Sequence, residues 1–218
     1  MGVSIDITER KHSEEQERLC AQEVEHRNKN LLGVVQGIVR LTKAATIEEF
    51  RETVVGRLDA LDRVHQVLMR KRRDRVDLRE LLLEELAAYD PNNAGRVRLT
   101  GPPVWIGVDA AQPLGMAFHE LATNAAKYGA FADASGELDV IWQLSQRSGT
   151  PLAIEWKETG IPPAETPHQL GFGTKLIRSV VEHQLHGTLS LDWEPSGLRC
   201  SIPYRCRAMR RIEIGRGR

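Results

Sequence analysis

Apolar residues recur every three or four positions in the stretch "EVEHRNKNLLGVVQGIVRLT", residues 23–42. This is the period of an amphipathic α-helix, which buries one of its faces. The preceding stretch "SEEQERLCAQEVEH" is charged and favours helix, so the helix is expected to begin near residue 13. The expected buried stripe consists of Val24, Leu31, Val35, Ile38 and Thr42.

A second helical pattern follows after only a few residues. Thr46 and Glu49 have the S/T-x-x-E spacing of a capping box, which marks a helix start. The run "RKRRDR" ends the pattern with positive charge that suits a helix C-terminus. Because the connection is short, the two helices are predicted to be antiparallel neighbours, whose stripes need another copy or another element to cover them. The second stripe consists of Phe50, Val54, Leu58, Leu61, His65 and Leu68.

After about residue 75, helical patterns alternate with strand-like runs, which indicates a mixed α/β layer domain. The predicted helices are residues 77–89, 112–128 and 171–185. The predicted strands are residues 96–100, 104–108, 137–144, 151–157, 187–193 and 198–203. Residues 1–12 have the pattern of a short strand that leads into the first helix. Residues 207–218 are basic and have the pattern of a solvated chain end.

Composition and charge exclude some classes of partner. Of the 218 residues, 41% are hydrophobic, which is enough for one ordinary domain and a smaller one. Thirty Lys and Arg balance thirty Asp and Glu. Such a chain has no global electrostatic attraction for nucleic acid or for an anionic membrane, so neither is an expected partner.

The cysteines and the lengths of the apolar runs indicate the cellular compartment of the protein. Cys20, Cys200 and Cys206 are too few and too scattered for a disulfide framework, and their spacing fits no zinc motif. No run of about 18 apolar residues occurs, and the first residues lack the apolar stretch of a signal peptide. The sequence therefore predicts a soluble protein of the reducing cytoplasm.

His26 is the first candidate for chemistry. On a helical wheel with Leu31 at zero, the buried stripe lies within about 40° of zero and His26 lies about 140° away. His26 is therefore expected to point outward, where an inconsequential surface histidine is the alternative. A core histidine is the better explanation for His65, which lies on the stripe of its own helix.

The stretch "HELATNAAKYGA", residues 119–130, provides a second candidate. Glu120, Asn124 and Lys127 are spaced i, i+4, i+7 and share one helix face. An ordinary solvated face is the alternative, but this spacing also suits a hydrated Mg²⁺ on the amide oxygen beside a carboxylate that polarises a nucleophile. The apolar side of the same helix is predicted to consist of Leu114, Phe118, Leu121, Ala125 and Tyr128.

Glycines mark two further stretches, "WKETGIPP" at residues 156–163 and "GFGTKLI" at residues 171–177. Glycines that enter a helix let backbone N–H groups approach a phosphate, which the helix N-terminus favours. A single G-x-G is weak evidence. The order of the motifs along the chain is stronger evidence than any one of them. An outward histidine on a helical hairpin comes first and is followed by E-x-x-x-N on a helix. An acid-x-Gly motif after a strand and a G-x-G motif at the start of a helix come next.

This order resembles that of the sensor histidine kinases, and its details resemble the HWE subgroup, over about residues 14–204. The box "HRNKN" at His26 looks like the phosphoacceptor box of the subgroup. His119 looks like the histidine that opens its ATP-binding helix, and Trp156 with Glu158 looks like its W-x-E signature. The opening "GVSIDITERKHSEEQ" looks like the last strand and exit helix of a PAS sensor domain.

The resemblance implies a role for each matching residue. His26 would receive the phosphoryl group, Glu120 would assist as base or polariser, and Asn124 would bind Mg²⁺. Lys127 would lie near the phosphates of ATP, and Glu158 would bind the adenine amino group. The glycines that line the nucleotide pocket would be Gly160, Gly171 and Gly173.

Two positions depart from the pattern of the subgroup. Glu25 precedes the histidine where relatives often have a neutral residue. Ile161 replaces a glycine that is usual after Gly160, which would stiffen the backbone there. Neither departure removes a reacting group.

The fold implied by the resemblance is α+β. A helical-hairpin dimerisation and phosphoacceptor domain would be followed by a two-layer α/β sandwich that binds ATP, of the gyrase and histidine-kinase type. The implied segments are the end of a PAS domain and linker at residues 1–12, the hairpin at 13–75, the ATP-binding domain at 76–206 and the basic tail at 207–218.

The implied activity is that of an ATP-dependent histidine kinase, which autophosphorylates on His26 with Mg²⁺ and passes the phosphoryl group to an aspartate of a response-regulator receiver domain. The implied assembly is a homodimer through the hairpin, with a monomer as the alternative. A catalytically silent nucleotide-binding module is the alternative function. A nucleic-acid-binding regulator is disfavoured, because aromatic residues make up only 5% of the chain.

Overall fold

The computed structural model describes residues 8–70, 75–90, 95–144, 152–160 and 171–204. The chain divides into two compact units, residues 1–40 and residues 41–218. The helices are α1 (Thr8–Leu41), α2 (Ile47–Arg70), α3 (Leu78–Leu86), α4 (Val108–Tyr128) and α5 (Phe172–Ser179), the last continued by a π-helical turn, Val180–Gln184. The strands are β1 (Arg75–Asp77), β2 (Val97–Thr100), β3 (Trp105–Gly107), β4 (Glu137–Leu144), β5 (Leu152–Thr159), β6 (Ser190–Glu194) and β7 (Gly197–Tyr204).

Helix α1 accounts for all of the described part of the first unit. It is uninterrupted and begins at Thr8, a few residues before the predicted start. The strand expected within residues 1–12 falls mainly on residues 1–7, which lie outside the described residues, as does the basic tail. None of the helices in the described parts of the chain combines the length and the apolar character that a membrane-spanning segment needs.

The predicted start of the second helix is confirmed. The backbone N–H of Glu49 donates to Thr46 Oγ1 at 3.1 Å, and the backbone N–H of Ala45 donates to the Glu49 carboxylate at 3.0 Å. The first hydrogen bond satisfies a backbone donor of the first helical turn, and the second ties the residue before Thr46 to that turn. Helix α2 accordingly begins at Ile47.

The buried face of α2 is rotated from the predicted stripe. Leu58 and His65 are exposed, so the prediction that His65 is a core histidine is wrong. The close approach of α2 to α4 explains the rotation, because a Cβ atom added at Gly115 of α4 would lie 2.3 Å from Cγ2 of Val64. The buried residues of α2 are Arg57, Ala60, Leu61, Val64, Val67 and Leu68.

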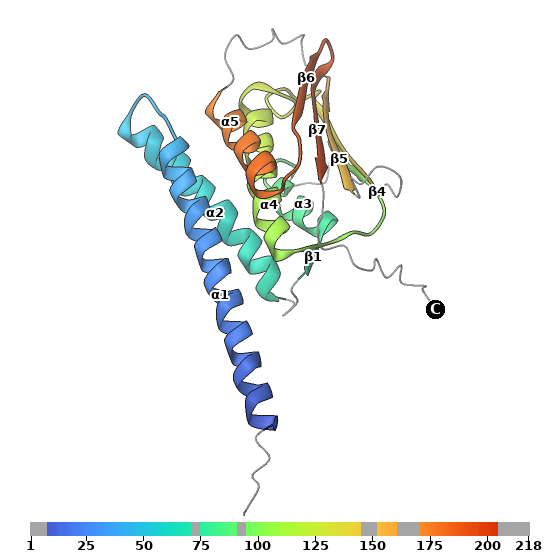
Figure 1. Ribbon diagram of the computed structural model, residues 1–218. Helices are drawn as coiled ribbons and strands as arrows, with labels where there is room; N and C mark the ends of the chain where they lie inside the picture. Colours follow the sequence, from blue (N-terminus) through green and yellow to red (C-terminus); the bar gives the residue numbers. More distant parts are fainter. Residues whose placement is uncertain (1–7, 71–74, 91–94, 145–151, 161–170, 205–218) are drawn as a thin grey trace, which may run out of the picture. The chain divides into compact units, whose positions relative to one another are not determined.

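The second unit contains a five-stranded sheet with the order β2-β4-β5-β7-β6. The pairing of β2 with β4 is parallel and the other pairs are antiparallel. Helices α4 and α5 lie over one face of this sheet, and the apolar core fills the space between the two layers (Figure 1). The helices and strands predicted after residue 75 are all present, and the two-layer α/β sandwich is confirmed.

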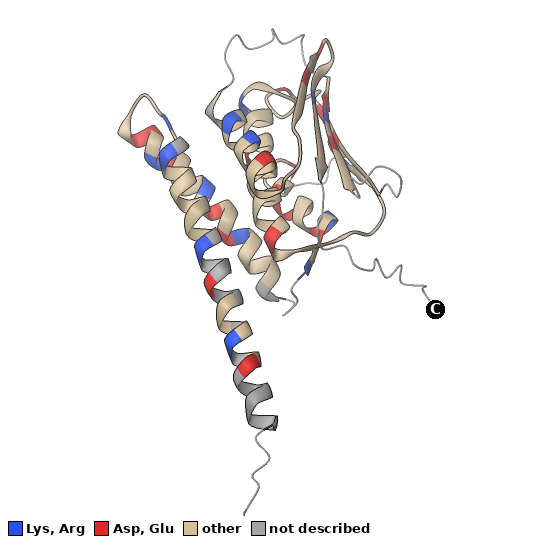
Figure 2. Cartoon of the chain, in the orientation of Figure 1, with Lys and Arg blue, Asp and Glu red and all other residues tan. Residues whose placement is uncertain are grey.

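The opposite face of the sheet is charged (Figure 2). Arg98 on β2 pairs with Glu137 and Asp139 of β4 at 2.9 and 2.6 Å, and Arg199 on β7 pairs with Glu155 of β5 at 3.0 Å. Exposed ion pairs of this kind contribute little to stability.

Helix α4 is the central element of the sandwich. It begins at Val108, four residues before the predicted start, and contains Pro113 near its N-terminus. Its predicted apolar side is confirmed at Leu114, Phe118, Leu121 and Ala125, all of which are buried. Tyr128 is 77% exposed, contrary to the prediction, because it is the last residue of the helix.

Candidate active site

Helix α4 carries three of the predicted site residues on one face, which runs from the protein interior to the solvent. Glu120 is only 5% exposed, Asn124 is half-buried and Lys127 is exposed. The alternative of an ordinary solvated face is therefore wrong at Glu120. The burial of this carboxylate requires a partner, since an unpaired buried charge is costly.

The partner of Glu120 is Arg57 of α2. Arg57 Nε donates to Glu120 Oε1 at 2.6 Å and Nη2 donates to Oε2 at 2.8 Å, which is the parallel two-bond geometry of an arginine–carboxylate pair. Arg57 Nη1 also donates to Thr42 Oγ1. Both side chains of the ion pair are almost fully buried. No local sequence pattern marks Arg57, because its partner lies 63 residues further along the chain.

The glycine turn predicted at residues 171–177 meets this part of α4. A Cβ atom added at Gly173 would lie 2.7 Å from Glu120 Oε2 and 3.4 Å from both polar atoms of the Asn124 amide. Helix α5 begins directly at this turn, with Gly171 as its N-cap. The structure therefore brings Gly173 of α5 together with Glu120 and Asn124 of α4.

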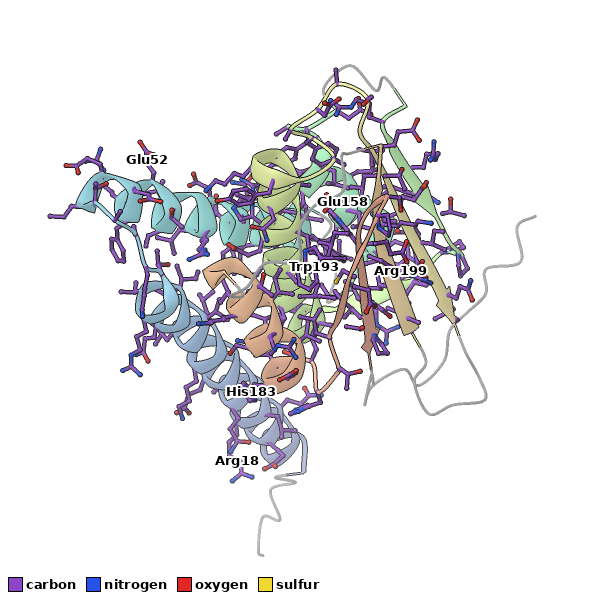
Figure 3. The ribbon with its side chains drawn as sticks, turned by 90° about the horizontal axis from the view of Figure 1, so that it is seen from above. Arg18, Glu52, Glu158, His183, Trp193 and Arg199 are labelled. Atoms are coloured by element: carbon purple, nitrogen blue, oxygen red, sulfur yellow. The ribbon has the colours of Figure 1, made fainter. Side chains whose placement is uncertain are left out.

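Glu158 lies at the other end of the site, between α4 and the sheet (Figure 3). It is 2% exposed, so it is not a solvated glutamate at the end of a strand. Its Oε1 accepts a hydrogen bond from Trp156 Nε1 at 3.0 Å, and its Oε2 accepts one from the Ala130 backbone N–H at 2.9 Å. Burial raises the pKa of Glu158 above its ordinary value, and these two hydrogen bonds oppose the rise.

Strand alternation explains why Trp156 and Glu158 face the same way. On β5 every second residue from Leu152 to Glu158 is buried, which places both members of the W-x-E motif on the helical side. The end of α4 is fitted closely to this carboxylate, because a Cβ atom added at Gly129 would lie 1.9 Å from Glu158 Oε2. The segment after α4 thus touches the glutamate of β5.

Gly160 has a backbone conformation that favours glycine. Its φ is +76°, and a Cβ atom there would lie 2.4 Å from the carbonyl oxygen of Ser135. The Ser135 hydroxyl donates to the Gly160 carbonyl at 3.1 Å. The next residue, Ile161, lies outside the described residues.

His119 is not at the start of α4 but in its middle. Its Nδ1 lies 3.3 Å from Nη2 of Arg63 on α2 and 3.5 Å from Oε2 of Glu85 on α3. Arg63 also pairs with Glu85 at 3.0 Å. His119 therefore joins the three helices rather than lining the space beside Asn124 and Gly173.

His26 lies on α1, in the first compact unit. Its side chain is outside the described part of the chain. The expectation that it points outward therefore stays a prediction.

Asn124 offers an oxygen that suits Mg²⁺. Within the described residues, no group of three or more His, Cys, Asp or Glu side chains is arranged to hold a metal ion. Mg²⁺ in nucleotide sites usually takes one or two protein oxygens and completes its shell with water and phosphate oxygens. The half-buried amide beside the glycine turn fits that pattern.

Comparisons with known proteins find similarity to histidine kinases. Residues 23–103 match the family model described as HWE histidine kinase. A blue-light-activated histidine kinase of Rhizobium johnstonii is 35% identical over 204 residues, which are 92% of this chain and 58% of the relative. A blue-light-activated histidine kinase of Brucella anthropi is 32% identical over 91% of this chain and 41% of its own length. The chain thus spans 58% or less of these two curated relatives.

Solved structures show the same fold. A blue-light activated histidine kinase of Erythrobacter litoralis has a TM-score of 0.57 at 23% identity, over 84% of this chain and 58% of that one. The histidine kinase domain of that protein has a TM-score of 0.52 at 18% identity and is covered over 95% of its length. Residues 23–103 therefore carry an HWE histidine kinase domain match, and the chain has the fold of a histidine kinase.

Proposed function

We propose that this chain is the kinase part of a sensor histidine kinase, which transfers the γ-phosphoryl group of ATP to His26 and then to an aspartate of a response-regulator receiver domain. The observation that carries the proposal is the meeting of Gly173 with Glu120 and Asn124. It supports a nucleotide site in which the amide and the glycine turn face the phosphates. The homology to histidine kinases supports the same activity.

The two ends of the proposed nucleotide site lie along one stretch of α4. Asn124 would face the metal and the phosphates, while Gly129 adjoins Glu158, the proposed adenine partner. Five residues of helix separate these positions, which is about 7.5 Å along the axis. Glu158 retains acceptor capacity for the adenine amine, because a carboxylate offers about four lone-pair directions and its two protein partners use two.

Phosphoryl transfer requires positioning and neutralisation of charge more than covalent chemistry by the protein. The metal, when bound, would neutralise phosphate charge, and Asn124 would hold it. Backbone N–H groups at the start of α5 and the exposed ammonium of Lys127 would add positive potential. One imidazole nitrogen of His26 would attack the γ-phosphorus, and the bond to the β-phosphate oxygen would break as ADP leaves.

Glu120 would polarise the attacking imidazole. An unperturbed imidazole has a pKa of about 6.5 and is largely neutral near pH 7, so a strong base is not required. Arg57 uses two of the lone-pair directions of the Glu120 carboxylate and leaves the others for a hydrogen bond. His26 would approach Glu120 within one chain or from a second copy bound through the hairpin.

The proposed assembly and location follow the same reasoning. The phosphoacceptor domain would comprise α1 and α2 within residues 13–75, and the ATP-binding domain would comprise α3 to β7 within residues 76–206. We propose a cytoplasmic kinase that dimerises through the hairpin. A receiver domain is then its expected protein partner.

Removal of the Asn124 amide tests the nucleotide site. Asn124→Ala is expected to lose the Mg²⁺-dependent part of ATP binding, measured by calorimetry in Mg²⁺ and in EDTA. Autophosphorylation should fall by roughly a hundredfold or more, as when a group that stabilises transition-state charge is removed. Asn124→Asp keeps a metal-binding oxygen and should retain more of the Mg²⁺ effect.

The matched control is Gln143→Ala, which removes an exposed amide on β4 and should behave like the wild type. Wild-type Mg²⁺-dependent binding and phosphorylation in Asn124→Ala would refute the proposed site. A wild type that binds ATP with Mg²⁺ but acquires no phosphoryl group would instead support the alternative of a catalytically silent nucleotide-binding module.

A further inference from the structure

Arg96, just before β2, makes an unusual set of contacts for a residue outside the proposed site. Its Nη2 donates to the carbonyl oxygen of Ala130 at 2.8 Å and also to that of Asp133. Its Nε donates to the carbonyl oxygen of Gly136 at 3.1 Å. All three acceptors belong to the segment 129–136, which connects α4 to β4. One guanidinium therefore holds three carbonyl groups of a single loop.

Arg96 is itself held in place at two points. Its backbone carbonyl accepts a hydrogen bond from the N–H of Leu138 at 2.8 Å, where β4 begins beside β2. Its guanidinium lies 5.8 Å from the centre of the Phe131 ring, and that ring stacks on Tyr89 with 5.2 Å between centroids. The side chain is half-buried, so its hydrogen bonds are partly shielded from water.

The loop that Arg96 holds is the loop that holds Glu158. The N–H of Ala130, whose carbonyl Arg96 binds, donates to Glu158 Oε2 at 2.9 Å. Five positions further on, the backbone N–H of Ser135 donates to the Asp133 carboxylate at 2.8 Å, and the Ser135 hydroxyl donates to the Gly160 carbonyl at 3.1 Å. The same eight residues thus contact both the carboxylate of β5 and the glycine that follows it.

The composition of the loop explains why it needs an outside support. The sequence "GAFADASG" has only one large side chain, Phe131, and five of its members are glycine or alanine. Small side chains fix a backbone poorly, and each buried carbonyl must find a donor. Arginine suits this task because its planar fork offers five donors in fixed directions, whereas lysine is a point charge with three rotating donors.

We propose that Arg96 is a positioning residue for the adenine pocket, which fixes the Glu158 carboxylate through the backbone of Ala130. Arg96 itself does not touch the nucleotide. The inference rests on the proposed function, in which Glu158 reads the adenine amino group. Its consequence is that Arg96 controls the preference for ATP over GTP.

The test compares ATP and GTP affinities in the full chain, with Mg²⁺ present. Arg96→Gln is expected to weaken ATP binding about tenfold, which corresponds to about 1.4 kcal/mol, while GTP binding changes little. The ATP preference should fall by the same factor, and most of the kinetic effect should appear in the KM for ATP. Arg96→Lys should keep part of the preference for ATP, with a loss of about threefold, because lysine keeps the positive charge but lacks the planar guanidinium with its fixed donors.

Arg98→Gln is the matched control, because Arg98 lies two residues away and pairs only with Glu137 and Asp139 on the exposed face among the described contacts. It should leave both affinities unchanged. In a Glu158→Ala background, Arg96→Gln should have no further effect on the preference, since the two changes act through the same carboxylate.

Two results would overturn the inference. One is an Arg96→Gln or Arg96→Lys chain with the wild-type preference for ATP. The other is an equal loss of ATP and GTP affinity in both variants, which indicates a general structural role. A different result would show that Glu158 does not read the adenine. In that case the Glu158→Ala chain itself would retain the preference for ATP.

Discussion

Replacing Arg57 with alanine is expected to lower the free energy of unfolding of the unit formed by residues 41–218 by about 3–5 kcal/mol. The reason is the burial of its partner, since Glu120 would remain only slightly exposed with its charge uncompensated. Chemical denaturation followed by circular dichroism measures the change. The outcome tests whether α2 and α4 are joined through this ion pair.

Arg98→Ala provides a matched control for burial. Arg98 also forms two hydrogen bonds with a carboxylate, that of Asp139, but its side chain is 51% exposed. Exposed pairs contribute about 0–1 kcal/mol, so this variant should be close to wild type. In the double variant Arg57→Met with Glu120→Leu, apolar groups replace both charges, and most of the lost stability should return. An Arg57→Ala chain no less stable than Arg98→Ala would contradict the assigned pair.

Replacing Glu158 with alanine is expected to weaken ATP binding by about tenfold to a hundredfold, the value of a buried hydrogen bond to a charged group. Guanine carries a carbonyl group where adenine carries the amine, and the Glu158 carboxylate would repel the oxygen of that carbonyl. The wild type should therefore prefer ATP over GTP, and Glu158→Ala should lose most of that preference. Glu158→Gln, which keeps an acceptor oxygen, should be less affected than Glu158→Ala.

Glu155→Ala is the control on the same strand, because Glu155 pairs with Arg199 on the opposite face of the sheet. It should bind both nucleotides like the wild type.

The raised pKa of Glu158 adds a pH test, because protonation removes the charge at a higher pH than for an ordinary glutamate. The ATP preference should therefore begin to fall, on acidification, before ordinary carboxylates titrate. Unchanged ATP affinity and preference in Glu158→Ala would show that another group reads the adenine.

Local periodicity was sufficient to predict most elements of the second unit, but not the short strand β1. The strands β4, β5 and β7 and the helices α3 to α5 fall close to their predicted positions, because each buries one face against the core. The W-x-E spacing also placed Trp156 and Glu158 on one side of a strand. These features depend on neighbours a few residues apart, which a sequence pattern reports directly.

The missed features depend on partners that are distant in sequence. No local pattern predicts that Arg57 is buried, because its partner Glu120 lies 63 residues further along the chain. His65 lies outside the face of α2 that packs against α4. Arg96 and Ala130 are 34 residues apart, and no local motif predicts their hydrogen bond. Side-chain pairs across elements thus complete the site that the motifs located.

Transfer of label from γ-labelled ATP to the chain tests the central claim most directly. With Mg²⁺, the wild type should acquire a label that acid removes and alkali does not, as expected for phosphohistidine, and peptide mass spectrometry should place it on His26. His26→Ala should acquire none, whereas His183→Ala, which removes an exposed histidine of the π-helical turn (Figure 3), should match the wild type. Wild-type labelling of His26→Ala would contradict the proposed phosphoacceptor.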